Sequence, residues 1–187
     1  MPRSHIYNLP NSLSLVRIVC IPLLILLCSW SWRWAGLAAA VVFALAAVTD
    51  FLDGYLARKM GRVTVLGRFL DPVADKLIVS AAMIMLVAMD RAPAWVVFVI
   101  IGREIAVTGL RAAAAAAAEG LVIDAGWWGK AKTVSQIVAI LGLLVHEKIF
   151  GLEAELIGTV GLYAALGLTI LSGYFYFKDY WAVISRS

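Results

Sequence analysis

Charged residues are scarce in this sequence, making up 15% of its 187 residues, whereas 63% are hydrophobic. Cysteine and histidine each occur only twice. Cys20 and Cys28 lie eight residues apart in one apolar stretch, about 12 Å at the rise of a helix, which excludes a disulfide between them. His5 lies near the N-terminus and His146 near the end of a predicted helix, which argues against a histidine nucleophile.

Long polar linkers, heptads and internal repeats are also absent, whereas apolar stretches dominate, with a mean hydropathy of +0.93. Such a chain has more apolar surface than one water-soluble core can bury. About 20 apolar residues cross the hydrocarbon layer as a helix, and the stretches lack the alternation of barrel strands. We therefore predict an all-α integral membrane protein, one domain over residues 1–187 with a short N-terminal segment 1–12. Its six transmembrane helices are expected at residues 13–28, 35–56, 72–89, 94–110, 134–146 and 156–177.

Positive charge is distributed unevenly between the predicted connecting segments. Ten of the sixteen lysines and arginines fall in one alternating set of segments, which includes both termini, and three fall in the other. Because cytoplasmic loops carry the excess of positive charge, both termini are expected in the cytoplasm. The predicted location is a membrane that the chain crosses several times, with membrane lipids as neighbours; no nucleic-acid partner is expected.

Four aspartates lie within or beside the second and third apolar stretches: Asp50, Asp53, Asp71 and Asp75. A carboxylate near hydrocarbon is costly unless it is paired, hydrated or bound to a cation. The first two are three residues apart and the last two are four apart, so each pair shares one face of its helix. Hard oxygen ligands suit Mg²⁺ or Mn²⁺. The sequence therefore predicts a polar cavity, open to the cytoplasm, that holds one or two divalent ions.

A simpler interpretation is that these carboxylates pair with nearby basic residues, and that Asp71 caps the third helix ahead of Pro72. Small residues beside the acids, Gly54, Ala57 and Gly67, leave room for a ligand to approach the backbone. They would also suit close packing between membrane helices.

The acidic and small residues together form one spaced pattern, Asp50-x2-Asp53-Gly54-x2-Ala57-Arg58-x8-Gly67-x3-Asp71-x3-Asp75. This pattern resembles the signature of the CDP-alcohol phosphatidyltransferases at each fixed position. The resemblance implies that the four aspartates bind two metal ions and that Asp75 is also the general base. It further implies a nucleotide site for CDP-diacylglycerol made by Gly54, Ala57, Arg58, Gly67, Asn11 and Ser14.

Basic residues in the second half of the chain suggest a site for an anion. Arg103 and Arg111 are eight residues apart and can share a helix face, with Glu104 placed to orient them. Lys130 and Lys132 enter the fifth predicted helix, where the helix dipole also favours anions. Topology signalling or attraction to anionic headgroups would explain the two lysines equally well.

Three segments resemble the bacterial phosphatidylglycerophosphate synthases within that family: residues 9–17, 102–111 and 129–133. The resemblance implies that glycerol 3-phosphate is the acceptor, bound by Arg103, Arg111, Lys130 and Lys132, and that the enzyme is a homodimer working by direct displacement. The last predicted helix shows no motif. Alternatives are a sibling enzyme that uses inositol phosphate, serine or phosphatidylglycerol, and, in another class, a divalent-cation transporter.

Overall fold

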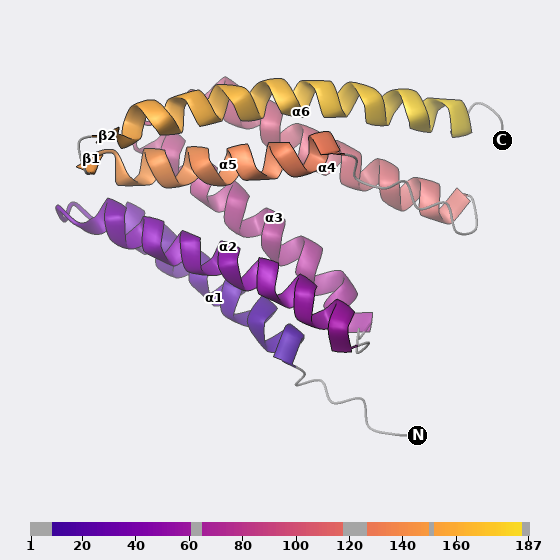
Figure 1. Cartoon of the computed structure of the whole chain (residues 1–187), viewed down its shortest axis with the longest axis horizontal. Coiled ribbons are helices and arrows are strands. Elements are labelled where there is room, and N and C mark those ends of the chain that lie inside the picture. Colours follow the sequence, from indigo (N-terminus) through magenta and orange to yellow (C-terminus); the bar gives the residue numbers. More distant parts are fainter. Residues whose placement is uncertain (1–8, 61–64, 118–126, 150–151, 185–187) are drawn as a thin grey trace. The chain divides into compact units, whose positions relative to one another are not determined.

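The computed structural model describes the backbone of residues 9–60, 65–117, 127–149 and 152–184. Within these ranges it describes the side chains of residues 15–50, 73–111, 113, 127–147 and 153–178. The described chain is helical apart from one short hairpin, and it divides into two compact units (Figure 1). Unit 1 comprises residues up to Arg91 together with Leu144–His146, and unit 2 comprises Ala92–Leu143 and the chain from Glu147 onward.

Unit 1 contains three helices: α1 (Leu9–Cys28), α2 (Ala35–Met60) and α3 (Val65–Ala88). α1 packs along both α2 and α3. The interior of the unit is lined by apolar side chains from all three helices, including Leu24, Ala39, Phe43, Ala82 and Leu86. Alanines at these positions let the helix backbones approach one another, as is common between membrane helices.

The end of α3 has a Schellman motif, which explains where the helix stops. The amide of Arg91 donates to the carbonyl of Leu86 at 2.8 Å, and the amide of Asp90 donates to that of Val87 at 3.0 Å. Asp90 has a φ of 56°, in the left-handed region that glycine usually occupies at this position. The Arg91 side chain in turn donates to the carbonyl of Leu144 at 2.8 Å, which satisfies a carbonyl at the end of α5.

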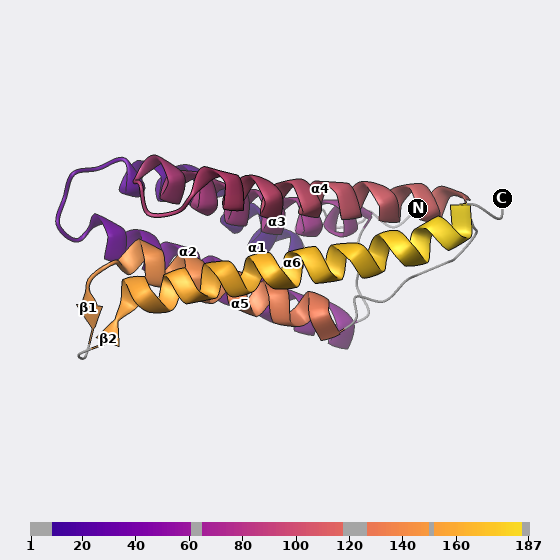
Figure 2. The same ribbon diagram turned by 90° about the horizontal axis from the view of Figure 1, so that it is seen from above.

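Unit 2 contains α4 (Ala94–Ala117), α5 (Trp127–Val145) and α6 (Ala154–Ile184), with α4 packed along α6. Two-residue strands β1 (Lys148–Ile149) and β2 (Leu152–Glu153) pair antiparallel between α5 and α6, with Lys148 opposite Glu153. Figure 2 shows α5 and α6 side by side. This hairpin sends α6 back antiparallel to α5.

Glycine sets how closely α5 and α6 pack. A Cβ added at Gly142 would lie 2.7 Å from the Cα of Gly158, and one added at Gly158 would lie 2.6 Å from the amide nitrogen of Leu143. One added at Gly161 would lie 3.1 Å from the amide nitrogen of Ala139. Any side chain at the first two positions would force the backbones apart, so these contacts fix the distance and register of the two helices.

Large apolar side chains on the outer surface indicate that the protein lies in a membrane. Val19, Phe98, Ile105 and Val160 are all more than 60% exposed, which would be costly in water. Within the described residues, α5 and the Ala154–Lys178 part of α6 are long and apolar enough to cross a membrane. Shorter apolar helical stretches are Leu15–Cys28 and Ala35–Asp50.

The six predicted helices are all present among the described residues, and each of them is longer than predicted. α1 begins at Leu9, α2 continues to Met60, α3 begins at Val65 and α5 begins at Trp127. The four aspartates therefore lie inside α2 and α3, six or more residues from the nearest helix end. Asp71 does not begin the third helix, and Gly67 lies within α3 and not on a loop. The alanine run that begins at residue 112 extends α4 through Ala117, beyond the predicted end at residue 110.

Candidate functional site

The aspartates of unit 1 occupy matching levels on α2 and α3. Asp50 lies ten residues before the end of α2 and Asp75 ten residues after the start of α3, about 15 Å from the intervening connection at the rise of a helix. Asp53 and Asp71 are seven and six residues from the same helix ends, about 10 Å. The two helices are in contact. The aspartates therefore lie at two heights along the helix pair, Asp50 with Asp75 and Asp53 with Asp71, about one helical turn apart.

Arg17 of α1 pairs with the first of these aspartates. Its Nη1 lies 2.9 Å from Oδ1 of Asp50, and only 1% of the Arg17 side chain is exposed, against 44% for Asp50. The guanidinium thus approaches the carboxylate from inside the unit, while the rest of the carboxylate stays accessible. Sequence reasoning placed Arg17 inside a predicted helix without assigning it a partner, although an arginine amid apolar residues was itself a signal.

The chemistry of the donor set fits a hard divalent cation. Asp50 and Asp75 supply carboxylate oxygens and are each partly exposed. Among the side chains that the structure describes, no three carboxylate, histidine or cysteine groups gather closely enough to hold a metal. Asp53 and Asp71, which would complete the predicted set, lie outside those side chains. The predicted nucleotide residues also lie outside them: Asn11, Ser14, Gly54, Ala57, Arg58 and Gly67.

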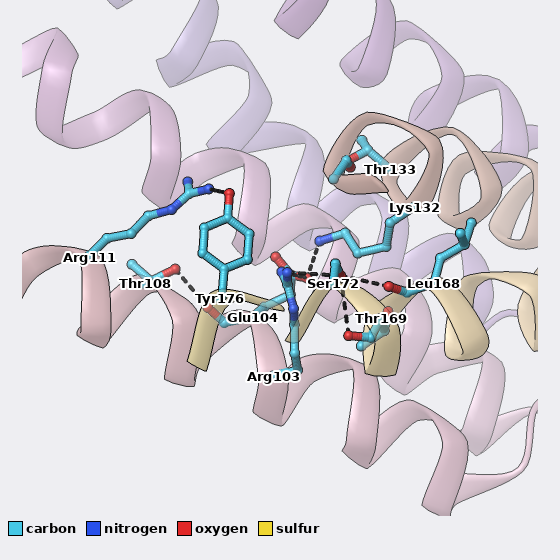
Figure 3. A network of polar contacts seen from close by, with 11 residues as sticks. Arg103, Glu104, Thr108, Arg111, Lys132, Thr133, Leu168, Thr169, Ser172 and Tyr176 are labelled. Carbon is cyan, nitrogen blue, oxygen red and sulfur yellow. Dashed lines mark hydrogen bonds and ion pairs between the residues drawn. The ribbon is translucent and has the colours of Figure 1, made fainter. Parts of the chain in front are cut away.

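A second polar cluster lies in unit 2, centred on Glu104 of α4 (Figure 3). Its Oε1 accepts hydrogen bonds from Nη1 of Arg103, at 3.2 Å, and from Nζ of Lys132 on α5. The side chains of Arg103 and Lys132 are 11% and 7% exposed. Two buried cations thus share one carboxylate oxygen, as sequence reasoning expected for Glu104 and Arg103.

Helix α6 completes this cluster with two side chains that the sequence did not identify. Nη2 of Arg103 donates to Oγ of Ser172 at 3.0 Å, and Arg111 donates to the hydroxyl of Tyr176. The guanidinium carbons of Arg103 and Arg111 lie 5.4 and 4.8 Å from the centre of the Tyr176 ring, within cation–π range. Tyr176 therefore holds both arginines in place, and Figure 3 shows its ring between them.

The structure brings together three of the four predicted acceptor residues. Arg103, Arg111 and Lys132 all belong to the cluster, whereas the Lys130 side chain is exposed two residues before Lys132, on another face of α5. The missed residues of α6 had a signal, because Thr169, Ser172 and Tyr176 recur at intervals of three and four in an apolar helix. This spacing places three polar side chains on one face.

Comparison with known proteins identifies the class. The model of the CDP-alcohol phosphatidyltransferase family matches residues 7–171, which include helices of both units, and the chain belongs to that family. It is thus a phosphatidyltransferase, as the aspartate pattern predicted.

Three relatives of this chain carry the same name, CDP-diacylglycerol–glycerol-3-phosphate 3-phosphatidyltransferase. The protein of that name from Bacillus subtilis is 44% identical, over 97% of this chain and 99% of its own length. Those from Pseudomonas fluorescens and Rickettsia typhi are 41% and 39% identical, over 93% and 91% of this chain and 90% and 96% of their own. The similarity extends over nearly the whole length of each protein.

Proposed function

We propose that this enzyme transfers the phosphatidyl group of CDP-diacylglycerol to sn-glycerol 3-phosphate, giving phosphatidylglycerophosphate and CMP. The observation that carries the acceptor assignment is the cluster of Arg103, Arg111 and Lys132 around Glu104. Three cations and one carboxylate have a formal charge of +2, which matches the dianion of a phosphate monoester. Serine, a zwitterion, would leave that charge uncompensated. The names of the relatives agree with this assignment.

The donor half of the reaction is assigned to unit 1. Asp50, Asp53, Asp71 and Asp75 would hold one or two Mg²⁺ or Mn²⁺ ions, which when bound supply positive charge to the pyrophosphate of CDP-diacylglycerol. Gly54, Ala57, Arg58, Gly67, Asn11 and Ser14 are proposed to contact that substrate, with Arg58 as a phosphate partner. Arg17 is proposed to hold Asp50 in the orientation that ligation requires, because it lies 2.9 Å from Oδ1 and is buried.

Asp75 is proposed as the general base. Its carboxylate takes the proton of the acceptor hydroxyl, whose oxygen attacks the phosphorus that carries diacylglycerol. The bond from this phosphorus to the CMP oxygen breaks, and CMP leaves with its own phosphate. Arg103, Arg111 and Lys132 bind the acceptor phosphate and so limit the orientations of the hydroxyl. The polar side chains of α3, α4 and α5 thereby contribute positioning and proton transfer.

We further propose six membrane spans in a bacterial inner membrane, with both termini in the cytoplasm, and assembly as a homodimer. The support for the spans is the apolar surface of the helices, and the support for the orientation is the excess of positive charge in one set of connections. Labelling of single cysteines introduced near each terminus, with a reagent that cannot cross the membrane, tests the orientation. Labelling from outside intact cells would contradict it.

The test of the activity is CMP release by purified protein in detergent with CDP-diacylglycerol and Mn²⁺. Glycerol 3-phosphate, inositol phosphate, serine and phosphatidylglycerol are compared as acceptors. We expect turnover with glycerol 3-phosphate alone, and near-complete loss in Asp75→Asn. Turnover with a different acceptor only would refute the acceptor assignment, and absence of CMP release with every acceptor would favour the transport alternative.

A further inference from the structure

Three polar atoms in the interior of unit 2 have no hydrogen-bond partner among the described residues: Nε of Arg103, the amide nitrogen of Gln136 and the hydroxyl of Thr169. Gln136 is 4% exposed and Thr169 is fully buried. Buried polar groups are normally paired, because an unpaired one loses its hydration without compensation. Three such atoms in one three-helix unit therefore require an explanation.

These atoms border the charged cluster. Gln136 follows Lys132 by one turn of α5, and Thr169 precedes Ser172 by one turn of α6, so each lies on the same face as its neighbour. Because α5 and α6 are antiparallel, Gln136 and Thr169 both lie on the same side of the charged cluster, toward the glycine contacts of Gly158 and Gly161. The neutral polar groups thus lie on one side of the charged ones.

The third atom, Nε of Arg103, lies where α6 has no side chain. A Cβ added at Gly173 would be 3.4 Å from Cγ and 3.8 Å from Nε of Arg103. Figure 3 shows Arg103 reaching between Ser172 and Glu104, with Thr169 beside Ser172. Its two Nη atoms are engaged by these neighbours, Nη1 with Glu104 and Nη2 with Ser172, whereas Nε remains available as a donor.

The types of these groups indicate what they would bind. Arginine Nε and an amide nitrogen donate hydrogen bonds, whereas a threonine hydroxyl both donates and accepts. An alcohol hydroxyl offers the complementary functions and needs no charge. We propose that Gln136, Thr169 and Nε of Arg103 form a subsite for the hydroxyl of the acceptor that does not react, the secondary hydroxyl of a glycerol phosphate. This inference rests on the proposed function, since the neighbouring cluster would hold the phosphate of the same molecule.

Such a subsite would make the enzyme selective for the polyol and not only for its phosphate. A site built to hydrogen-bond a substrate hydroxyl discriminates strongly against an analogue that lacks it, because the protein groups are then left unpaired. Thr169 and Gln136 are then specificity residues, in contrast to Arg111 and Lys132, which attract any phosphate monoester.

The experiment uses Thr169→Val and Gln136→Met, which keep side-chain volume and remove the polar groups. Two constants are measured for each purified enzyme: KM for glycerol 3-phosphate, and Ki for 3-hydroxypropyl phosphate, which lacks the secondary hydroxyl. We expect KM to rise about fivefold or more in each variant, with Ki unchanged. Thermal stability should be equal or higher, because an unpaired buried group has been removed. Thr108→Val is the matched control, because its hydroxyl is exposed and donates to the Glu104 carbonyl, and it should change neither constant.

Each outcome decides the proposal. Unchanged KM in both variants, or an equal rise in KM and Ki, would overturn the hydroxyl subsite while leaving the phosphate site intact. A marked loss of thermal stability in both variants would assign the two side chains a structural role, and would also overturn it. Absence of turnover with glycerol 3-phosphate in the unmodified enzyme would instead refute the proposed function.

Discussion

The ion pair between Arg17 and Asp50 allows a prediction whose magnitude follows from unequal burial. Only 1% of the Arg17 side chain is exposed, against 44% for Asp50. Arg17→Met leaves the carboxylate next to solvent, which can hydrate it. Asp50→Asn removes an anion from a guanidinium that solvent does not reach. Asp50→Asn should therefore destabilise the metal-free protein more than Arg17→Met does.

The expected sizes follow from what breaking such pairs costs. Removing one partner of a fully buried pair costs about 3–5 kcal/mol, and exposed pairs contribute about 1 kcal/mol or less. With one buried and one half-exposed partner, we expect a loss of about 1–2 kcal/mol for Arg17→Met and about 2–4 kcal/mol for Asp50→Asn. The double variant should lose less than the sum, because both single changes remove the same contact between Arg17 and Asp50.

Reversible unfolding of the metal-free protein in detergent, with chelator present, gives these values for the two single variants and the double variant. Arg33→Met is the matched control, because Arg33 is exposed and lies over the Trp34 ring, and it should change the free energy of unfolding by less than about 0.5 kcal/mol. Strictly additive losses for Arg17 and Asp50, or a larger loss for Arg17→Met than for Asp50→Asn, would refute the reasoning.

Three further predictions concern the acceptor site, the metal and a helix end. Tyr176→Phe keeps the ring beside both arginines but removes the hydroxyl that accepts a hydrogen bond from Arg111. Steady-state kinetics should therefore show KM for glycerol 3-phosphate raised roughly fivefold, with kcat nearly unchanged. An unaltered KM would contradict this prediction. EDTA should abolish CMP release and Mn²⁺ or Mg²⁺ should restore it, whereas activity that survives chelation would exclude the metal. Asp90 has a φ of 56°, a conformation that glycine adopts with less strain, so Asp90→Gly should raise the free energy of unfolding by about 1 kcal/mol, measured by thermal unfolding. A lower stability would show that the contacts of the Asp90 side chain contribute more than the backbone strain costs.

The helices were largely predictable from the sequence, because apolar stretches of membrane length have few alternative structures. Their ends were less predictable. The predicted second helix stopped at residue 56, whereas α2 continues to Met60 through Arg58 and Lys59. Charge marks the end of the apolar segment but not of the helix, since lysine and arginine are good helix formers. The hairpin of β1 and β2 was missed because two-residue strands leave no periodic pattern.

The candidate site was predictable wherever its residues are close in sequence. Asp50 lies within about one helical turn of Asp53, Asp71 within about one turn of Asp75, and Arg103 is next to Glu104, so spacing alone predicts these pairs. The contacts of Arg17 with Asp50, and of Arg111 with Tyr176, join residues 33 and 65 positions apart. Such pairs depend on how the helices pack, which local periodicity does not encode. Periodicity could have placed Ser172 and Tyr176 on one face of α6, but not their contacts with Arg103 and Arg111.

The glycine contacts of unit 2 connect its packing to its proposed chemistry. Gly142 and Gly158 hold α5 and α6 at backbone contact, and a Cβ at either position would lie under 3 Å from the other helix. This contact fixes the register of the two helices, and the register sets where Lys132 of α5 lies relative to Ser172 and Tyr176 of α6. A shift of one residue would move the Lys132 backbone by about 1.5 Å, enough to break a hydrogen bond to Glu104. The apolar end of the α5–α6 hairpin thus fixes the position of the polar end, where Nε of Arg103, the amide nitrogen of Gln136 and the hydroxyl of Thr169 have no hydrogen-bond partner among the described residues.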